Sequence, residues 1–218
     1  MRIDIVSDVV CPWCFIGKRR FESALAGMEG FSPDIRWRAY RLDPTIPPGG
    51  VDRRAYLARK FGTGERPKTM AEAIRAAGAE AGIGFAFDRI ARTPNTLDAH
   101  RVIRWAGTAG VQGAVVERLF RAYFEEGLDL GDAAELARLG DEAGMDAALV
   151  AALLASDADV ALIEREDHLA RRLGIQGVPT FIFADRYMVS GALDPAQFTE
   201  ILTKMRAEYD AARQAAGA

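Results

Sequence analysis

The hydrophobic and polar positions at the start of the chain predict a strand, a helix and a second strand. Residues 2–6 alternate polar and apolar side chains and are rich in isoleucine and valine, which is typical of a short β-strand. Within residues 12–28 the apolar positions recur at intervals of three and four, which indicates a helix. Residues 34–40 alternate again. A β-α-β start favours a parallel pair of strands joined by a right-handed crossover.

The middle of the chain is predicted to be helical. Residues 43–50 hold three prolines and two glycines and form a linker, and the following 120 or so residues show helical spacing without a convincing strand. Thr93 and Pro94 predict the N-cap and first position of one of these helices.

Strand patterns return only near the end. Residues 180–183 and 187–189 predict a hairpin, and a last helix begins after Asp194 and Pro195. We therefore expect an α/β fold in which residues 1–45 and 161–218 form two halves of one unit. Residues 46–160 form a large all-helical insertion between the halves.

Composition removes several classes of protein. The net charge of -3 provides no basic excess for nucleic acid, and two cysteines cannot make a disulfide scaffold. No apolar run is long enough to span a membrane. Asp4 interrupts the apolar stretch that an export signal needs, so we expect a cytoplasmic protein.

The candidate chemistry lies in Cys11-Pro12-Trp13-Cys14, where the first strand meets the first helix. Residues i and i+3 of a first helical turn can bring two sulfur atoms within bonding reach. Pro12 fits the first helical position, which makes Cys11 the N-cap. There its sulfur can accept N–H groups and lies at the positive end of the helix dipole, and both effects favour the thiolate nucleophile. We expect Cys11 to attack a disulfide and Cys14, one turn further in, to resolve the mixed disulfide.

Other interpretations of these residues stay open at this stage. The cysteines could be buried structural residues, or two ligands of a zinc site, although His100 and His168 lack zinc-finger spacing, and we predict no metal. Both histidines are expected to be surface or satisfied core residues. Asp8 could move protons to the cysteine pair, but a turn-capping role is favoured. The basic run of residues 18–20 is expected to form a solvated face.

A second motif, Val178-Pro179-Thr180, precedes the late strand about 165 residues after the cysteines. In isolation Pro179 is typical of a strand start. Together the two motifs and the helical block between them resemble the thioredoxin fold of the disulfide-bond-formation protein A (DsbA) family. The stretches Ser7-Asp8-Val9-Val10-Cys11-Pro12-Trp13-Cys14 and Arg92-Thr93-Pro94-Asn95-Thr96-Leu97-Asp98-Ala99-His100-Arg101 are similar to its FrnE-like branch.

The resemblance implies that Pro179 is cis and faces the cysteine pair. It also implies that the Val178 backbone is free to pair with an extended substrate, so Pro12, Trp13, Val178, Pro179 and Thr180 are the predicted substrate-binding residues. The resemblance brings Asn95 to the active-site side of the helical insertion, although a helix-start role for Asn95 and Thr96 fits equally well.

The sequence departs from the exported oxidases of this family, which carry Pro-His between the cysteines. Trp13 has only an indole N–H and a large apolar face, so the strong oxidising power of those relatives is not expected of this chain. Trp13 is instead expected to form a hydrophobic lip for substrates rather than to pack in the core.

These residues predict a thiol-disulfide oxidoreductase that acts on substrate proteins, peptides or small thiols as a monomer or homodimer. It needs no bound cofactor, with glutathione as a possible co-substrate. The alternative is a glutathione-dependent isomerase or transferase related to 2-hydroxychromene-2-carboxylate isomerase and kappa-class glutathione transferase. Those relatives present serine where Cys11 stands. A third possibility is a peptide-binding module without enzymatic activity.

Overall fold

The two ends of the chain build one mixed sheet. The computed structural model describes residues 1–216. The sheet has the strand order β2-β1-β5-β6, in which β1 and β2 are parallel and the other neighbours are antiparallel. The elements of this unit are β1 (Arg2–Ser7), α1 (Pro12–Ala26), β2 (Asp34–Ala39), β5 (Thr180–Phe183), β6 (Tyr187–Ser190) and α9 (Pro195–Ala216). This arrangement confirms the predicted β-α-β start, the late hairpin and the α/β fold class.

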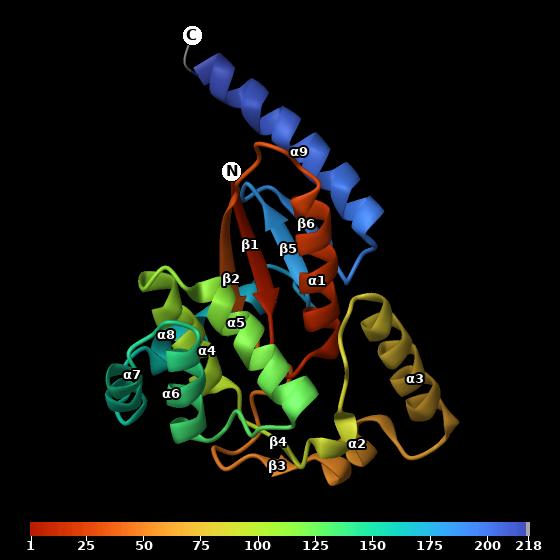
Figure 1. Cartoon of the computed structure of the whole chain (residues 1–218), viewed down its shortest axis with the longest axis vertical. Helices are drawn as coiled ribbons and strands as arrows, with labels where there is room; N and C mark the ends of the chain where they lie inside the picture. Colours follow the sequence, from red (N-terminus) through yellow and green to blue (C-terminus); the bar gives the residue numbers. More distant parts are fainter. Residues whose placement is uncertain (217–218) are drawn as a thin grey trace.

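Aromatic packing joins the N-terminal and C-terminal parts of the sheet unit. Phe21 of α1, Phe181 of β5 and Phe198 of α9 are completely or almost completely buried. Their ring centroids lie 4.7 to 5.5 Å apart, a normal distance for aromatic pairs. Helices α1 and α9 therefore pack on each other and both contact β5, and the far end of α9 extends beyond the sheet (Figure 1).

The helical insertion follows β2 and meets the sheet unit at the carboxyl end of β1 (Figure 1). Its core is continuous with that of the sheet unit, because Phe15 of α1 stacks on Phe120 with a centroid distance of 5.1 Å. Its helical elements are α2 (Arg53–Phe61), α3 (Glu65–Glu80), η1 (Phe87–Arg89), α4 (Leu97–Thr108), α5 (Gln112–Arg121), the π-helical turn η2 (Ala122–Glu126), α6 (Ala133–Glu142), α7 (Ala147–Leu154) and α8 (Val160–Arg172). Within residues 1–216, no helix combines the length and the apolar character needed to cross a membrane.

Two expectations for the insertion are wrong. It contains a short antiparallel pair, β3 (Val51–Asp52) and β4 (Arg92–Thr93), which is too brief to produce a visible alternation. Thr93 therefore belongs to a strand and Pro94 does not open a helix. Helix α4 begins at Leu97, whose N–H donates to the Asn95 side chain 3.0 Å away.

The expectation of a solvated basic face is also wrong for Lys18. Its side chain is 4% exposed and its Nζ lies 2.7 Å from both Glu22 and Glu117. Arg19 binds the second oxygen of Glu117 at 2.5 Å. The two cations therefore pair with α5 and fix α1 against the helical insertion.

Arg101 is a second buried cation in the insertion, and it closes the end of α7. Its side chain is 2% exposed and pairs with Asp98 of the same helix. The guanidinium also donates to a group of backbone carbonyls at and beyond the last turn of α7, those of Leu153, Leu154, Ser156 and Ala158. A helix end leaves its last carbonyls without partners inside the helix, and Arg101 supplies donors to them; the Leu153 carbonyl also accepts from the Ser156 N–H and hydroxyl.

Candidate active site

The two cysteines occupy the first turn of α1, at the carboxyl end of β1. Cys11 is the N-cap residue with an extended backbone (φ -93°, ψ 111°), and Pro12 is at the start of the helix. The turn that leads into the helix is closed by the Cys11 N–H, which donates to the Asp8 carbonyl at 3.0 Å. Both cysteines are free thiols in this structure. The predicted position of the pair is therefore confirmed.

The Cys11 sulfur makes a different contact from the one expected. It accepts no capping N–H from its own helix. Instead the thiol donates to the Val178 carbonyl at 3.5 Å, across 167 residues of sequence. The extended loop before β5 offers an acceptor at this position, and this contact brings the two sequence motifs together.

The two thiols differ in exposure, and the buried Cys14 has an altered pKa. Cys11 is 5% exposed and Cys14 is completely buried, so solvent reaches only Cys11. Burial raises the pKa of the Cys14 thiol well above its usual value, and the neighbouring Cys11 raises that pKa further. Hydrogen bonds from Ser7 and from the Asp8 backbone lower it in part. Cys14 thus holds its proton more tightly than an ordinary cysteine.

The loop opposite the cysteines has a cis peptide bond between Val178 and Pro179. Pro179 packs closely on α1 at Gly17, where a Cβ atom would lie only 2.8 Å from the proline Cγ. Thr180 is completely buried, and its hydroxyl donates to the Gly177 carbonyl at 2.8 Å and bonds Ser190 at 2.9 Å. Thr180 therefore holds the loop in shape and has no exposed surface to offer a ligand.

The two residues between the cysteines are partly exposed. Pro12 and Trp13 are both half-buried, and Trp13 packs in part against the main hydrophobic core. The core-packing interpretation of Trp13 therefore holds in part, and the rest of the side chain is accessible to solvent.

A polar cluster that periodicity does not indicate lies at the carboxyl end of β1. The Asp8 carboxylate accepts the Leu42 N–H at 2.7 Å, so it joins the ends of β1 and β2 instead of capping its own turn. Its other oxygen lies 3.5 Å from His100 Nε2. Both residues are buried. In the sequence, only the proximity of Asp8 to the cysteine motif could have suggested a role for it.

Asn95 connects the insertion to the end of β2. Its Oδ1 accepts from the Arg41 guanidinium at 3.0 Å and from Leu97 N–H, and its Nδ2 donates to the Ile46 carbonyl at 2.6 Å. This supports the helix-start role weighed for Asn95. It adds Arg41, a buried cation that the sequence pattern did not single out.

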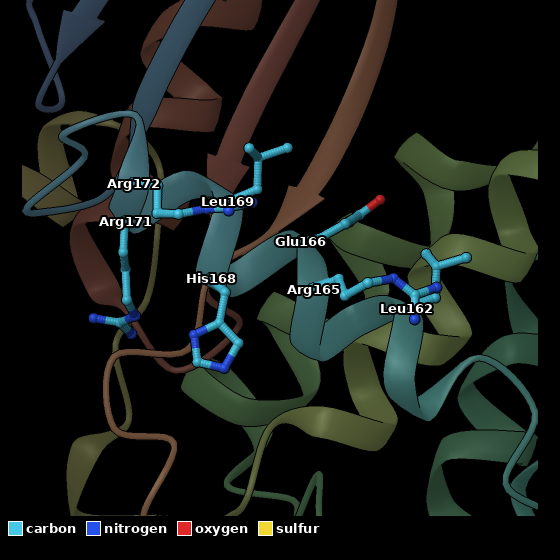
Figure 2. Close-up of a pocket in the computed structure, with 7 residues that line it drawn as sticks. All are labelled: Leu162, Arg165, Glu166, His168, Leu169, Arg171 and Arg172. Carbon is cyan, nitrogen blue, oxygen red and sulfur yellow. The ribbon is translucent and has the colours of Figure 1, made fainter.

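The hollow drawn in Figure 2 lies apart from this chemistry. All the side chains that line the hollow come from the single helix α8, and they spread away from this helix in several directions. The hollow is therefore an open surface. His168 belongs to this surface and is exposed. We therefore place the candidate site at Cys11 and Val178 rather than in this hollow.

A cysteine pair on the first turn of a helix, faced by a cis-proline loop from the same sheet, defines a thiol-disulfide site on a thioredoxin fold. A model of the DSBA-like thioredoxin domain matches residues 2–203, and the chain therefore belongs to the DSBA-like thioredoxin domain family.

Solved structures agree with this assignment. The chain is 31% identical to a probable DsbA oxidoreductase, SCO1869, from Streptomyces coelicolor; the match covers 95% of this chain and 91% of that one, with a TM-score of 0.86. The cytosolic disulfide reductase DsbM from Pseudomonas aeruginosa, solved with GSH, shares the fold at 20% identity and a TM-score of 0.65, over 98% of this chain and all of that one. A 2-hydroxychromene-2-carboxylate isomerase shares it at 19% identity and a TM-score of 0.64, over 100% and 98% of the two chains.

Proposed function

We propose that the protein is a thiol-disulfide oxidoreductase in which Cys11 is the nucleophile and Cys14 the resolving thiol. The observation that carries the proposal is the unequal position of the pair: Cys11 caps the helix, is 5% exposed and contacts the Val178 carbonyl, whereas Cys14 lies one helical turn further in and is completely buried. Family membership supports thiol-disulfide chemistry in general. The roles of the two sulfurs are inferred from the residues of this chain.

The reaction runs in two exchange steps. The Cys11 thiolate attacks one sulfur of a substrate disulfide, the substrate S–S bond breaks, and the other substrate sulfur leaves with the electron pair. Cys14 then loses its proton and attacks the Cys11 sulfur, which releases the second substrate thiolate and leaves a Cys11–Cys14 disulfide. The substrate gains two electrons and the cysteine pair loses them, so no bound cofactor is needed, and glutathione can serve as a small-thiol co-substrate.

Substrate binding is proposed along the loop that faces Cys11. Val178, whose carbonyl accepts from the Cys11 thiol, is partly exposed, and so are Pro12 and Trp13, which follow Cys11 in the sequence. An extended peptide could pair with the Val178 backbone, as an added strand does. Pro179 and Thr180 are buried, so their proposed contribution is to shape this loop.

Trapping tests the two roles directly. A Cys14→Ser variant mixed with glutathione disulfide or a disulfide-linked peptide is expected to accumulate a mixed disulfide at Cys11, measured by intact mass. The wild type should turn over without accumulating it, and Cys11→Ser should form no adduct. A stable adduct on Cys11→Ser would reverse the assignment, and the absence of exchange in the wild type would refute the function.

The glutathione-dependent isomerase or transferase is the alternative. It uses bound glutathione as the nucleophile and requires that residue 11 not be oxidised. A free Cys11 beside Cys14 disfavours it, because glutathione would form a mixed disulfide there. If Cys11→Ser keeps or gains turnover of an isomerase substrate with glutathione while losing disulfide exchange, the alternative is correct.

We also propose the branch of the family, the cell compartment and the assembly of the protein. We infer a FrnE-like member of the family, acting in the cytoplasm as a monomer or homodimer on disulfide-bearing proteins or peptides and on small thiols. The division into residues 1–45, 46–160 and 161–218 belongs to the same proposal. Sedimentation of the purified protein and cell fractionation would test the assembly and the compartment.

A further inference from the structure

Arg20 of α1 binds the chain segment that leads from β6 to α9, residues 191–194, which we call the β6–α9 segment. The Arg20 side chain is 14% exposed, and its guanidinium donates to the Ala192 carbonyl at 2.9 Å. Asp194 lies 3.0 Å from the same guanidinium nitrogen, and Glu80 of α3 lies 3.4 Å from the other. Both carboxylates are largely exposed to solvent, so their pairing with Arg20 contributes little. The partly buried bond to the Ala192 carbonyl is therefore the main contact of Arg20.

The β6–α9 segment also contacts the loop that faces the cysteines. The Gly191 N–H donates to the Pro179 carbonyl at 2.8 Å. Ala192 and Pro179 pack side by side on α1, since a Cβ atom added to Gly17 would lie 3.4 Å from Ala192 Cβ and 2.8 Å from Pro179 Cγ. Arg20 follows Gly17 by three residues, which is about one helical turn. A continuous series of contacts thus runs from Arg20 through the segment to Pro179.

The position of this loop affects the two redox states of the cysteine pair differently. In the dithiol form the Cys11 thiol donates to the Val178 carbonyl, which directly precedes Pro179. A Cys11–Cys14 disulfide has no S–H group, so it cannot make this hydrogen bond. A loop that is held at this place therefore stabilises the dithiol form relative to the disulfide form.

We propose that Arg20 is a positioning residue that holds the Val178 carbonyl at the Cys11 sulfur and thereby favours the dithiol form. This inference rests on the proposed function. Arg20 acts through the β6–α9 segment and takes no part in the exchange itself. In that exchange glutathione disulfide accepts two electrons from the cysteine pair, its S–S bond breaks, and the Cys11–Cys14 bond forms. The two cysteine protons end on the two glutathione thiols, so the reaction is balanced.

The equilibrium of the purified protein with defined mixtures of glutathione and glutathione disulfide tests the proposal. Arg20→Met keeps an aliphatic side chain but removes the donors to Ala192. We expect it to raise the equilibrium constant for oxidation by glutathione disulfide about twofold to fivefold, measured by mass after acid quenching and alkylation. One hydrogen bond contributes a factor of roughly 2 to 13, and a thiol is a weak donor, so the effect lies at the low end.

This equilibrium separates positioning from a structural role. A loss of stability that is equal in the two redox forms would leave the equilibrium constant unchanged, because the constant depends only on the difference between the forms. A wild-type constant in Arg20→Met would therefore overturn the proposal. Arg20→Gln is a milder second variant and should shift the constant in the same direction.

The acidic partners of Arg20 provide matched controls. Asp194→Asn and Glu80→Gln each remove one of its ion pairs and leave the bond to the Ala192 carbonyl in place. Both variants should keep the wild-type equilibrium constant. If either one shifts the constant as far as Arg20→Met does, the effect is electrostatic and the assigned role of the carbonyl bond is wrong.

Hydrogen exchange measured by NMR locates the effect in the fold. The Gly191 amide, which bonds the Pro179 carbonyl, should exchange at least about fivefold faster in Arg20→Met than in the wild type. The Trp37 amide of β2, which bonds the Gln112 side chain at 2.9 Å, should keep its wild-type rate. An unchanged rate at Gly191 would show that Arg20 does not hold the loop. If the wild type itself exchanges no electrons with glutathione, the proposed function fails instead.

Discussion

Gly17→Ala should disturb the active site from the back of α1. A Cβ atom at this position would lie 2.8 Å from Pro179 Cγ and 3.4 Å from Ala192 Cβ. The proline contact would have to lengthen by about 0.6 Å to reach 3.4 Å, the short end of ordinary contacts. Neither partner can yield easily, because Pro179 has a rigid ring and Gly17 lies inside a packed helix.

The cost follows from overpacking. Inserting one methyl group into a packed core costs roughly 1–3 kcal/mol, and the helix preference of alanine over glycine returns about 0.5–1 kcal/mol. We expect a net loss of roughly 1–2 kcal/mol in the free energy of unfolding, measured by urea titration. A displaced loop would also carry the Val178 carbonyl away from the Cys11 sulfur, and small misplacements of a reacting group are known to cost up to about 10²-fold in rate.

The matched control is Gly113→Ala, a glycine in α5 with open space around the added Cβ. This variant should be as stable as the wild type or more stable, with an unchanged rate of exchange against glutathione disulfide. If Gly17→Ala behaves like Gly113→Ala in both assays, the close packing of Pro179 on α1 does not constrain the site.

Three further changes test the packing and the titration of the molecule. Arg101→Met removes a buried guanidinium from its carbonyl partners and should lower the free energy of unfolding by about 3–5 kcal/mol, measured by urea titration; a loss below 1 kcal/mol would contradict the role assigned to it. Glu117→Gln leaves Lys18 with a single acidic partner and should cost about 1–3 kcal/mol in the same assay, unless the pairing of α1 with α5 contributes little. Because the pKa of Cys14 is raised, the folded protein keeps this proton at a pH where the unfolded chain has lost it. Cys14 should therefore leave the free energy of unfolding of the reduced protein constant below about pH 9 and lower it by up to about 1.4 kcal/mol per pH unit above that pH. Cys14→Ala should lack that part of the pH dependence, and a reduced wild type whose stability stays flat above pH 9 would refute the raised pKa.

The parts of the fold that local periodicity determines could be predicted from the sequence. The strands of the central sheet and the helix that starts at Pro12 each have a recognisable pattern over at least three residues. The β3–β4 pair could not be predicted, because two residues are too few to show alternation. For the same reason the sequence predicts the start of α4 at Pro94 instead of Leu97. The Leu97 N–H donates to the Asn95 side chain, and this hydrogen bond replaces the expected cap.

Long-range pairing limits prediction at the site. The cysteine spacing indicates the chemistry by itself, but the Val178 partner of Cys11 is 167 residues away and was reached only through resemblance to a family. Lys18 has the local sequence of an exposed residue but is buried, and one of its two acidic partners, Glu117, lies 99 residues away in the sequence. His100 carries no sequence feature that connects it to Asp8, and only the packing of α4 on β2 brings the two together.

The site is therefore a product of the complete tertiary structure and not of the cysteine motif alone. Cys11 and Cys14 come from the N-terminal half, Val178 and Pro179 from the C-terminal half, and His100 from the insertion between them. The hydrophobic core that contains both cysteines runs continuously through all three parts, so none of them can open without disturbing the other two. We infer that the raised pKa of Cys14 exists only while this core is intact, because burial is its largest cause. In a partly unfolded chain the pKa of the Cys14 thiol would return toward its ordinary value.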